Sequence, residues 1–183
     1  MAENGRFYTL SGDKLPRGRG FGEPLSLMLD IPADASIIAI MRGGIGKMLL
    51  ASNAGHGMIV DMQSAIAQTR SGKQVLNLGA GGKAVICVPA QGDMVAVVGQ
   101  NRRLLVFALS ELPEMTRGKG VILQRYRDGE LADIKVFESE AGLTWQMGGG
   151  RTRTETDMLT WTGKRGSAGK LPPTGFPRPA RFT

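Results

Sequence analysis

A basic sequence unit recurs about every fifty residues, and this repeat constrains the fold more than any other feature. Each copy opens at Gly or Asn, continues through a short apolar strand and a polar turn, and ends in a cluster of Arg, Lys and Gly. The copies are GRFYTLSGDKLPRGRG (5–20), GHGMIVDMQSAIAQTRSGK (55–73), NRRLLVFALSELPEMTRGKG (101–120) and GRTRTETDMLTWTGKRG (150–166). The leading basic residues, separated by 53, 47 and 48 residues, are Arg17, Arg70, Arg117 and Arg165. A period of this length built from short strands predicts a propeller-like array.

Short apolar runs bounded by Gly, Asn, Asp and Pro predict an all-β chain with at most a turn of helix. Strands are expected at 36–41, 47–52, 57–62, 73–78, 83–88, 93–98, 102–109, 120–126, 132–137 and 143–147. Hairpin turns are expected at 42–46, 52–57, 89–93 and 98–102.

The repeat divides the chain into blades of about four antiparallel strands. We expect repeats at about 1–32, 33–80, 81–127 and 128–172, followed by an irregular basic tail at 173–183. The first repeat begins mid-unit, on a strand with no hairpin partner. Either its partner comes from elsewhere in the fold, or the chain is part of a longer protein.

The net charge favours a polyanionic partner. It is +7 with a pI of about 10.0, and residues 151–183 alone contribute +5, from seven Lys/Arg and two Asp/Glu. The single cysteine, Cys87, lies in an apolar run and is expected to be a buried structural residue. No apolar run approaches the ~20 residues of a membrane span, so we expect no membrane partner and a cytoplasmic location.

The sequence offers no catalytic or metal-ligating set. The only histidine, His56, lies in a Gly-His-Gly turn, and one His with one Cys does not make a zinc site. Four Gly-Lys pairs lack both the preceding Gly and the following Ser or Thr that a phosphate-binding loop requires.

The four basic clusters combine cations with glycines, which let backbone amides and side chains approach a phosphate together. The alternative is that Arg and Lys only solubilise these loops while Gly serves the turns. The clusters lack interleaved aromatic residues, and no recognition helix is evident. Duplex backbone binding without base readout is therefore the favoured interpretation.

At these clusters the sequence resembles the C-terminal domains of the A subunits of bacterial type IIA topoisomerases, gyrase and topoisomerase IV. Gyrase carries a box, QRRGGKG, of which QTRSGKQ (68–74) keeps four of seven residues. TRGKG (116–120) and PRGRGFG (16–22) are further degenerate versions, and residues 102–120 are especially similar to topoisomerase IV. Because no copy of the box is intact, the chain resembles topoisomerase IV more than gyrase.

The resemblance implies a β-pinwheel of about four four-stranded blades that exchange strands, with an incomplete first blade. It also implies non-sequence-specific binding of duplex DNA by a basic outer rim, which would present DNA to the strand-passage core of topoisomerase IV. The matching rim positions, the last two less close to the pattern, are Arg17, Arg19, Arg70, Lys73, Arg117, Lys119, Lys164 and Arg165. The implied partners are duplex DNA and the rest of the enzyme (the remainder of its A subunit, plus its B subunit), in the nucleoid-associated cytoplasm.

In this family the strand-cleaving tyrosine lies in another domain, as do the sites for ATP and magnesium. We therefore expect no catalytic residue, metal or cofactor here, within a parent ATP-dependent type IIA topoisomerase. Arg125-Tyr126 copies the Arg-Tyr pair of that site but lies in a repeat strand and lacks the rest of the motif. The alternative function is a propeller-type scaffold for protein partners, with basic solubilising loops.

Overall fold

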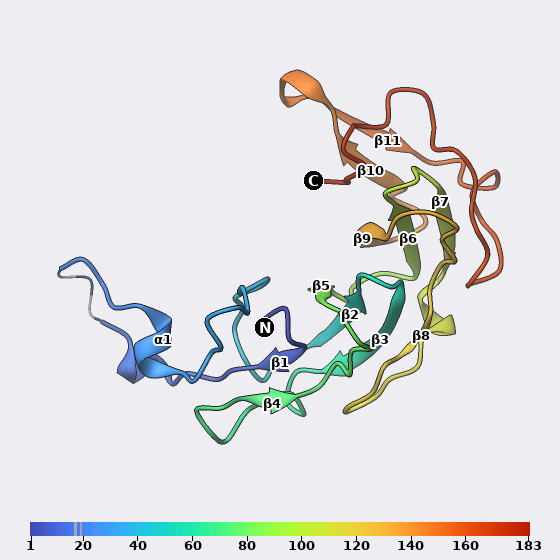
Figure 1. The fold of residues 1–183 in the computed structure, drawn as a ribbon. Coiled ribbons are helices and arrows are strands. Elements are labelled where there is room, and N and C mark those ends of the chain that lie inside the picture. The colour runs from blue at the N-terminus through green and yellow to red at the C-terminus, as the bar shows by residue number, and fades with distance from the viewer. Residues whose placement is uncertain (17, 19) are drawn as a thin grey trace.

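Small antiparallel sheets follow one another along an open arc in the computed structural model, which describes residues 1–183 except Arg17 and Arg19 (Figure 1). The first sheet pairs β1 (Arg6–Phe7) with β4 (Lys73–Gln74). The second has the order β5 (Ala84–Pro89), β2 (Lys47–Ser52), β3 (His56–Asp61), β8 (Val121–Ile122). The third is β7 (Leu104–Ala108), β6 (Met94–Gly99), β9 (Leu131–Phe137), and the last is β10 (Leu143–Gln146), β11 (Thr152–Glu155).

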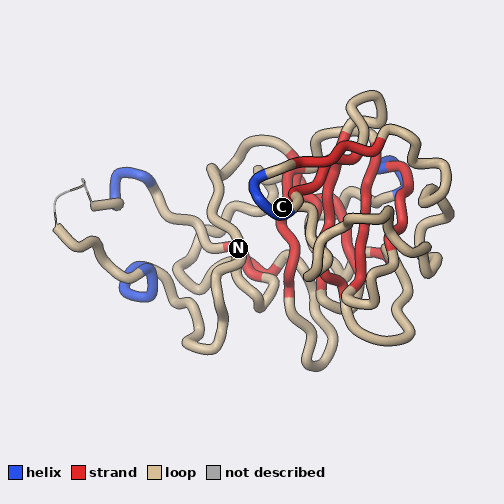
Figure 2. The backbone as a smooth tube through the Cα atoms, turned by 90° about the horizontal axis from the view of Figure 1, so that it is seen from above, coloured by secondary structure: helices blue, strands red, loops and turns tan. Residues whose placement is uncertain are grey.

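Short helical turns complete the described structure. They are η1 (Gly12–Lys14), α1 (Leu25–Met28), η2 (Leu109–Glu111) and η3 (Gly148–Gly150). Seen from above, the segment that carries η1 and α1 extends away from the sheets at the N-terminal end of the arc (Figure 2). In the part of the chain that the structure describes, no helix is long and apolar enough to cross a bilayer.

The strands of the central blades are continuous apolar runs because other blades pack against both of their faces. Successive side chains of a strand point to opposite faces. Along β2, Leu49 therefore enters the core shared with the third sheet, and Leu50 enters the core shared with the first. Along β6, Val95 joins the same shared core as Leu49, whereas Ala96 faces β10 and the C-terminal segment. Each of the two central sheets is thus packed between two cores, one on either face.

Strand exchange links neighbouring blades. β8 follows β7 in the chain but pairs with β3 of the preceding blade, with His56 opposite Ile122 and Gly57 opposite Val121. A Cβ at Gly120 would lie 2.2 Å from the Gly57 carbonyl oxygen, and its φ is +77°, so only glycine allows β8 to approach β3 this closely. At the next blade, bridges from Leu104 to Lys170 and from Val106 to Thr162 join β7 to the following repeat in the same way.

Six expected strands, now β2, β3, β5, β6, β9 and β10, appear within one residue of their predicted ends, and several other expectations were wrong. Residues 36–41 form no strand, because among the described residues their inter-segment backbone hydrogen bonds and bridge go only to Met1–Glu3; Ile37 bridges Ala2, and the Met1 ammonium donates to the Ala39 carbonyl at 2.8 Å. The turn at 42–46 therefore joins no hairpin. Residues 89–93 connect two blades instead, since β5 pairs with β2 and not with β6.

The expected strands at 73–78 and 120–126 shorten to two residues each, as β4 and β8. The residues that follow hydrogen-bond to a basic cluster of the next repeat instead of continuing a ladder. Residues 152–155, which were not expected to be a strand, form β11 against β10 with Trp145 opposite Arg153.

The C-terminal segment 173–183 has no helix or strand, yet it contributes to the core of the last blade. Phe176, Ala180 and Phe182 are buried there, and the Phe176 ring centroid lies 5.4 Å from that of Trp145 and 5.5 Å from that of Phe182. The Phe182 carbonyl accepts the Gln146 amide at 3.0 Å. This irregular segment therefore covers the face of β10 that would otherwise be open.

Replacing Phe182 by Ala is expected to lower the free energy of unfolding by about 3–5 kcal/mol, because it empties a buried aromatic position. The neighbouring exposed Arg181→Ala should change it by no more than about 0.5 kcal/mol. Urea unfolding of the two variants measures the difference. Equal stability would show that the C-terminal segment does not hold the last blade.

Candidate nucleic-acid interface

Three of the four basic clusters lie where a segment of one repeat pairs with the preceding one. We number the four clusters 1 (16–22), 2 (68–74), 3 (116–120) and 4 (163–167) in chain order. Cluster 3 docks on the segment after cluster 2: the Gly118 amide donates to the Val75 carbonyl at 3.0 Å, and the Asn77 amide to the Gly118 carbonyl at 2.8 Å. Cluster 4 docks likewise on the segment after cluster 3, with the Gly166 amide donating to the Leu123 carbonyl at 2.8 Å.

Cluster 2 places exposed cations beside a loop. The Arg70 guanidinium donates to the Leu27 carbonyl at 2.8 Å and lies 3.5 Å from the Asp30 carboxylate. The Lys73 ammonium donates to the Ser64 carbonyl at 2.6 Å. Arg70 and Asp30 are both more than half exposed, so their ion pair contributes little stability. Both cations remain accessible to a polyanion.

Cluster 3 is also exposed. The Arg117 Nε donates to the Asn77 side-chain oxygen at 3.3 Å, across the junction. Lys119 makes no ion pair among the described residues. Burial lowers the pKa of nearby His56, and the charge of Lys119 lowers it further, so His56 is neutral at pH 7.

The two cations of cluster 4 lie in different environments. Lys164 is exposed, whereas Arg165 is half-buried and donates to the Ile122 carbonyl at 2.5 Å. Arg165 thereby ties the fourth repeat to β8. In cluster 1, Arg17 and Arg19 lie outside the described residues, so these two predicted positions have no structural description.

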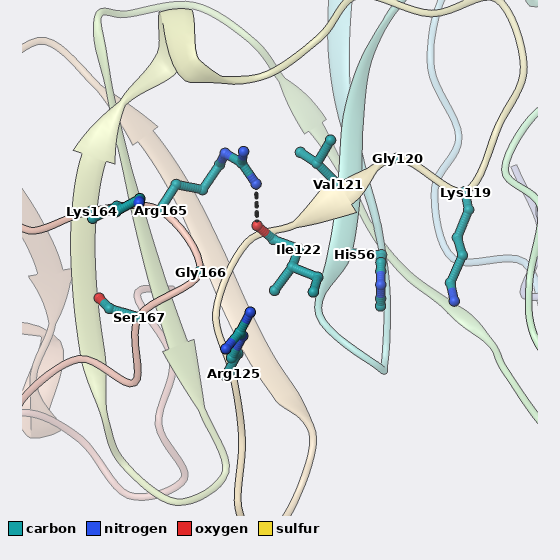
Figure 3. Close-up of a pocket in the computed structure, with 10 residues that line it drawn as sticks. All are labelled: His56, Lys119, Gly120, Val121, Ile122, Arg125, Lys164, Arg165, Gly166 and Ser167. Carbon is teal, nitrogen blue, oxygen red and sulfur yellow. Dashed lines mark hydrogen bonds between the residues drawn. The ribbon is translucent and has the colours of Figure 1, made fainter.

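Clusters 3 and 4 line one hollow of about 580 Å³ between β8 and residues 164–167, which we call the inter-blade groove (Figure 3). The described residues that line it include no Asp or Glu. They are His56, Lys119, Gly120, Val121, Ile122, Arg125, Lys164, Arg165, Gly166 and Ser167. The groove therefore gathers four formal positive charges without a compensating acid. Arg70 and Lys73 of cluster 2 lie apart from it, beside other hollows.

Two lining residues, His56 and Arg125, were not proposed from the sequence. His56 did carry a signal, because a basic residue follows the opening Gly in three repeats, as Arg6, His56 and Arg151. No recurrent residue type marked Arg125, because the equivalent position one junction earlier is Asn77. That equivalence appears only in the backbone hydrogen bonds of the two segments.

Tyr126 and Cys87 lie in packing positions. The Tyr126 ring fits between two glycines, where a Cβ at Gly55 or at Gly99 would come within 2.6 Å of it. Burial raises the pKa of its phenol. Cys87, expected to be buried, is partly exposed; its Sγ lies 3.9 Å from the Met41 sulfur, and burial raises the pKa of the thiol to about 11.

Comparison with known proteins agrees with this geometry. A family model described as DNA gyrase C-terminal domain, beta-propeller, matches residues 93–132. The A subunit of DNA topoisomerase 4 from Rickettsia bellii is 42% identical over 183 residues, all of this chain and 25% of that protein. Its counterpart from Caulobacter vibrioides is 45% identical over the same span, 24% of its length. The chain thus spans about a quarter of the length of these relatives.

Solved structures of related domains have a similar fold. The Escherichia coli ParC C-terminal domain superposes with a TM-score of 0.82 at 28% identity, covering 94% of this chain and 75% of that one. The structure of the DNA gyrase A C-terminal domain has a TM-score of 0.70 at 12% identity, covering 94% of this chain and 60% of that one, and shows the shared fold alone.

These findings identify the chain as a β-pinwheel domain of the gyrase A C-terminal domain family. Within that family it is related to the C-terminal domain of the bacterial topoisomerase IV A subunit. The predicted fold class and the sequence resemblance are confirmed. The individual site residues remain predictions.

Adjacent residues of cluster 4 should differ in their effect on folding. Arg165→Ala removes the hydrogen bond to Ile122 and is expected to destabilise the domain by about 1–2 kcal/mol. Lys164→Ala, with the same loss of charge at an exposed position, should cost no more than about 0.5 kcal/mol. Denaturant unfolding measures both values, and equal effects would contradict the structural role of Arg165.

Proposed function

We propose that this domain binds duplex DNA by its phosphates, without sequence preference, through basic clusters that follow the outer side of the arc. One observation carries the proposal: cluster 2 adjoins β4 and cluster 3 adjoins β8, and both strands lie on the convex side (Figure 1). Consecutive blade junctions thus present cations toward the same side. A curved series of this kind fits a continuous phosphate backbone.

The chemistry of the clusters supports backbone contacts over base readout. Arg and Lys bind phosphate oxygens through charge-assisted hydrogen bonds, and each contact releases condensed counterions. The described residues hold no helix of a length that could read the major groove, since α1 has four residues. The net charge of +7 would also speed encounter with DNA.

In the parent protein, the domain would present DNA to the strand-passage core of topoisomerase IV. Its proposed protein partners are therefore the remainder of the A subunit, together with the B subunit. We assign strand cleavage and the use of ATP and magnesium to other domains of the parent enzyme. The residues of this chain would hold and position DNA in the nucleoid-associated cytoplasm.

The salt dependence of binding tests the proposal directly. With about four to eight phosphate contacts, a plot of log affinity for duplex DNA against log salt should be linear, with a slope of about −4 to −7. Fluorescence anisotropy at several salt concentrations measures it. A slope near zero, or a strong preference for one short sequence, would overturn phosphate binding and favour the protein-scaffold alternative.

Cluster 2 allows a residue-level test with a matched control. Replacing Arg70 and Lys73 together by Ala should weaken DNA binding and reduce the magnitude of the salt slope by roughly two. The thermal midpoint should change little, because both side chains are exposed. The control removes Arg178 and Arg181, two exposed cations near the C-terminus, which lies on the concave side (Figure 1).

The control should lose less DNA affinity than the cluster 2 variant despite the same change in net charge. Equal losses would show that binding follows total charge and not the position of the clusters.

A further inference from the structure

We propose that the inter-blade groove is a discrete phosphoryl-binding site, lined by Arg125 and His56 together with Lys119 and Arg165. The proposal adds residues outside the predicted clusters and a defined location on the arc. It rests on the proposed function only for the source of the phosphate, which we take to be a phosphodiester of bound DNA.

Unused hydrogen-bonding groups point to an anionic ligand. Among the described residues, the buried His56 Nδ1 and Arg165 Nε have no hydrogen-bond partner. Arg165 uses another nitrogen to reach the Ile122 carbonyl, which fixes the guanidinium across the groove (Figure 3). The Arg125 side chain makes no hydrogen bond within the described part of the chain. The two buried groups are costly to leave unpaired, and phosphate oxygens would satisfy them, while the exposed Arg125 guanidinium is free to contact the same ligand.

At the equivalent junction one blade earlier, the corresponding hydrogen-bond donors have protein partners. There Asn77 stands in the place of Arg125, and its side-chain oxygen accepts the Arg117 Nε at 3.3 Å. Arg6 stands in the place of His56, and its guanidinium donates to the Gln74 side-chain oxygen at 3.2 Å and to the Ser71 carbonyl at 2.7 Å. At the earlier junction these donors are therefore paired within the protein. In the groove the equivalent donors have no protein partner and can bind a ligand.

The electrostatics of the groove favour an anionic ligand such as a phosphate. Lys119, Arg125, Lys164 and Arg165 are all cationic, and none of the ten described lining residues is acidic. Arg binds phosphate in a bidentate manner, and Ser167 adds a hydroxyl at the rim. His56 is neutral at pH 7 and can donate one hydrogen bond without adding to the repulsion among these cations.

The site can be tested with inorganic pyrophosphate and with duplex DNA as separate probes. Pyrophosphate titration should shift the backbone amide NMR signals of Gly120 and Gly166, and Arg125→Ala should weaken that binding at least tenfold. The control is Arg127→Ala, which removes the same charge from an exposed residue two positions away that does not line the groove. Equal weakening by both variants, or shifts confined to other surfaces, would overturn the site.

The DNA arm distinguishes the two sources of phosphate. If a DNA phosphodiester occupies the groove, DNA should shift the same amides, and Arg125→Ala should reduce the magnitude of the salt slope by about one. Shifts with pyrophosphate but not with DNA would overturn the DNA assignment and make a free phosphate ester the ligand. Failure of the parent domain to bind any DNA would reject the proposed function, while the pyrophosphate titration would still decide the groove.

Discussion

The structure depends on the exchange of an outer strand between neighbouring repeats. A central strand such as β3 would have an unpaired edge of N–H and C=O groups if its own repeat had to complete the sheet. β8 supplies those hydrogen bonds from the following repeat, and Gly120 allows the two backbones to come together. Clusters 2, 3 and 4 each adjoin or contain such a pairing, so the hydrogen bonds that join the blades also fix the positions of their cations.

This dependence explains why the clusters combine two roles. Arg165 is held against the Ile122 carbonyl and stabilises the junction, while Lys164 beside it faces solvent. Arg117 bonds to Asn77 across the earlier junction but remains exposed. Glycine is needed in these segments at least as much for the close approach of strands as for any ligand. Structural and binding roles are therefore divided among adjacent residues of the same cluster.

The sequence was sufficient to predict the elements that depend on local chemistry. The runs that became β2, β3, β5, β6, β9 and β10 are apolar and bounded by turn residues, so their ends were predicted within one residue. The choice of partner strand was not visible in periodicity, because hydrogen bonding across repeats has no local pattern. Residues 36–41 show the consequence: they are as apolar as residues 83–88 but lack the neighbour that β2 provides to β5. The clusters were found because Arg and Gly recur, whereas Arg125 lay in an ordinary strand sequence and its neighbours became known only from the fold.

The central claim is that DNA lies along the convex side, where the basic clusters meet the exchanged strands. Hydrogen–deuterium exchange of the domain with and without a mixed-sequence duplex tests it most directly. The account predicts that DNA slows exchange in peptides that cover residues 68–74, 116–125 and 163–167 and leaves β5 and β9 unchanged. Protection confined to the concave side would contradict it.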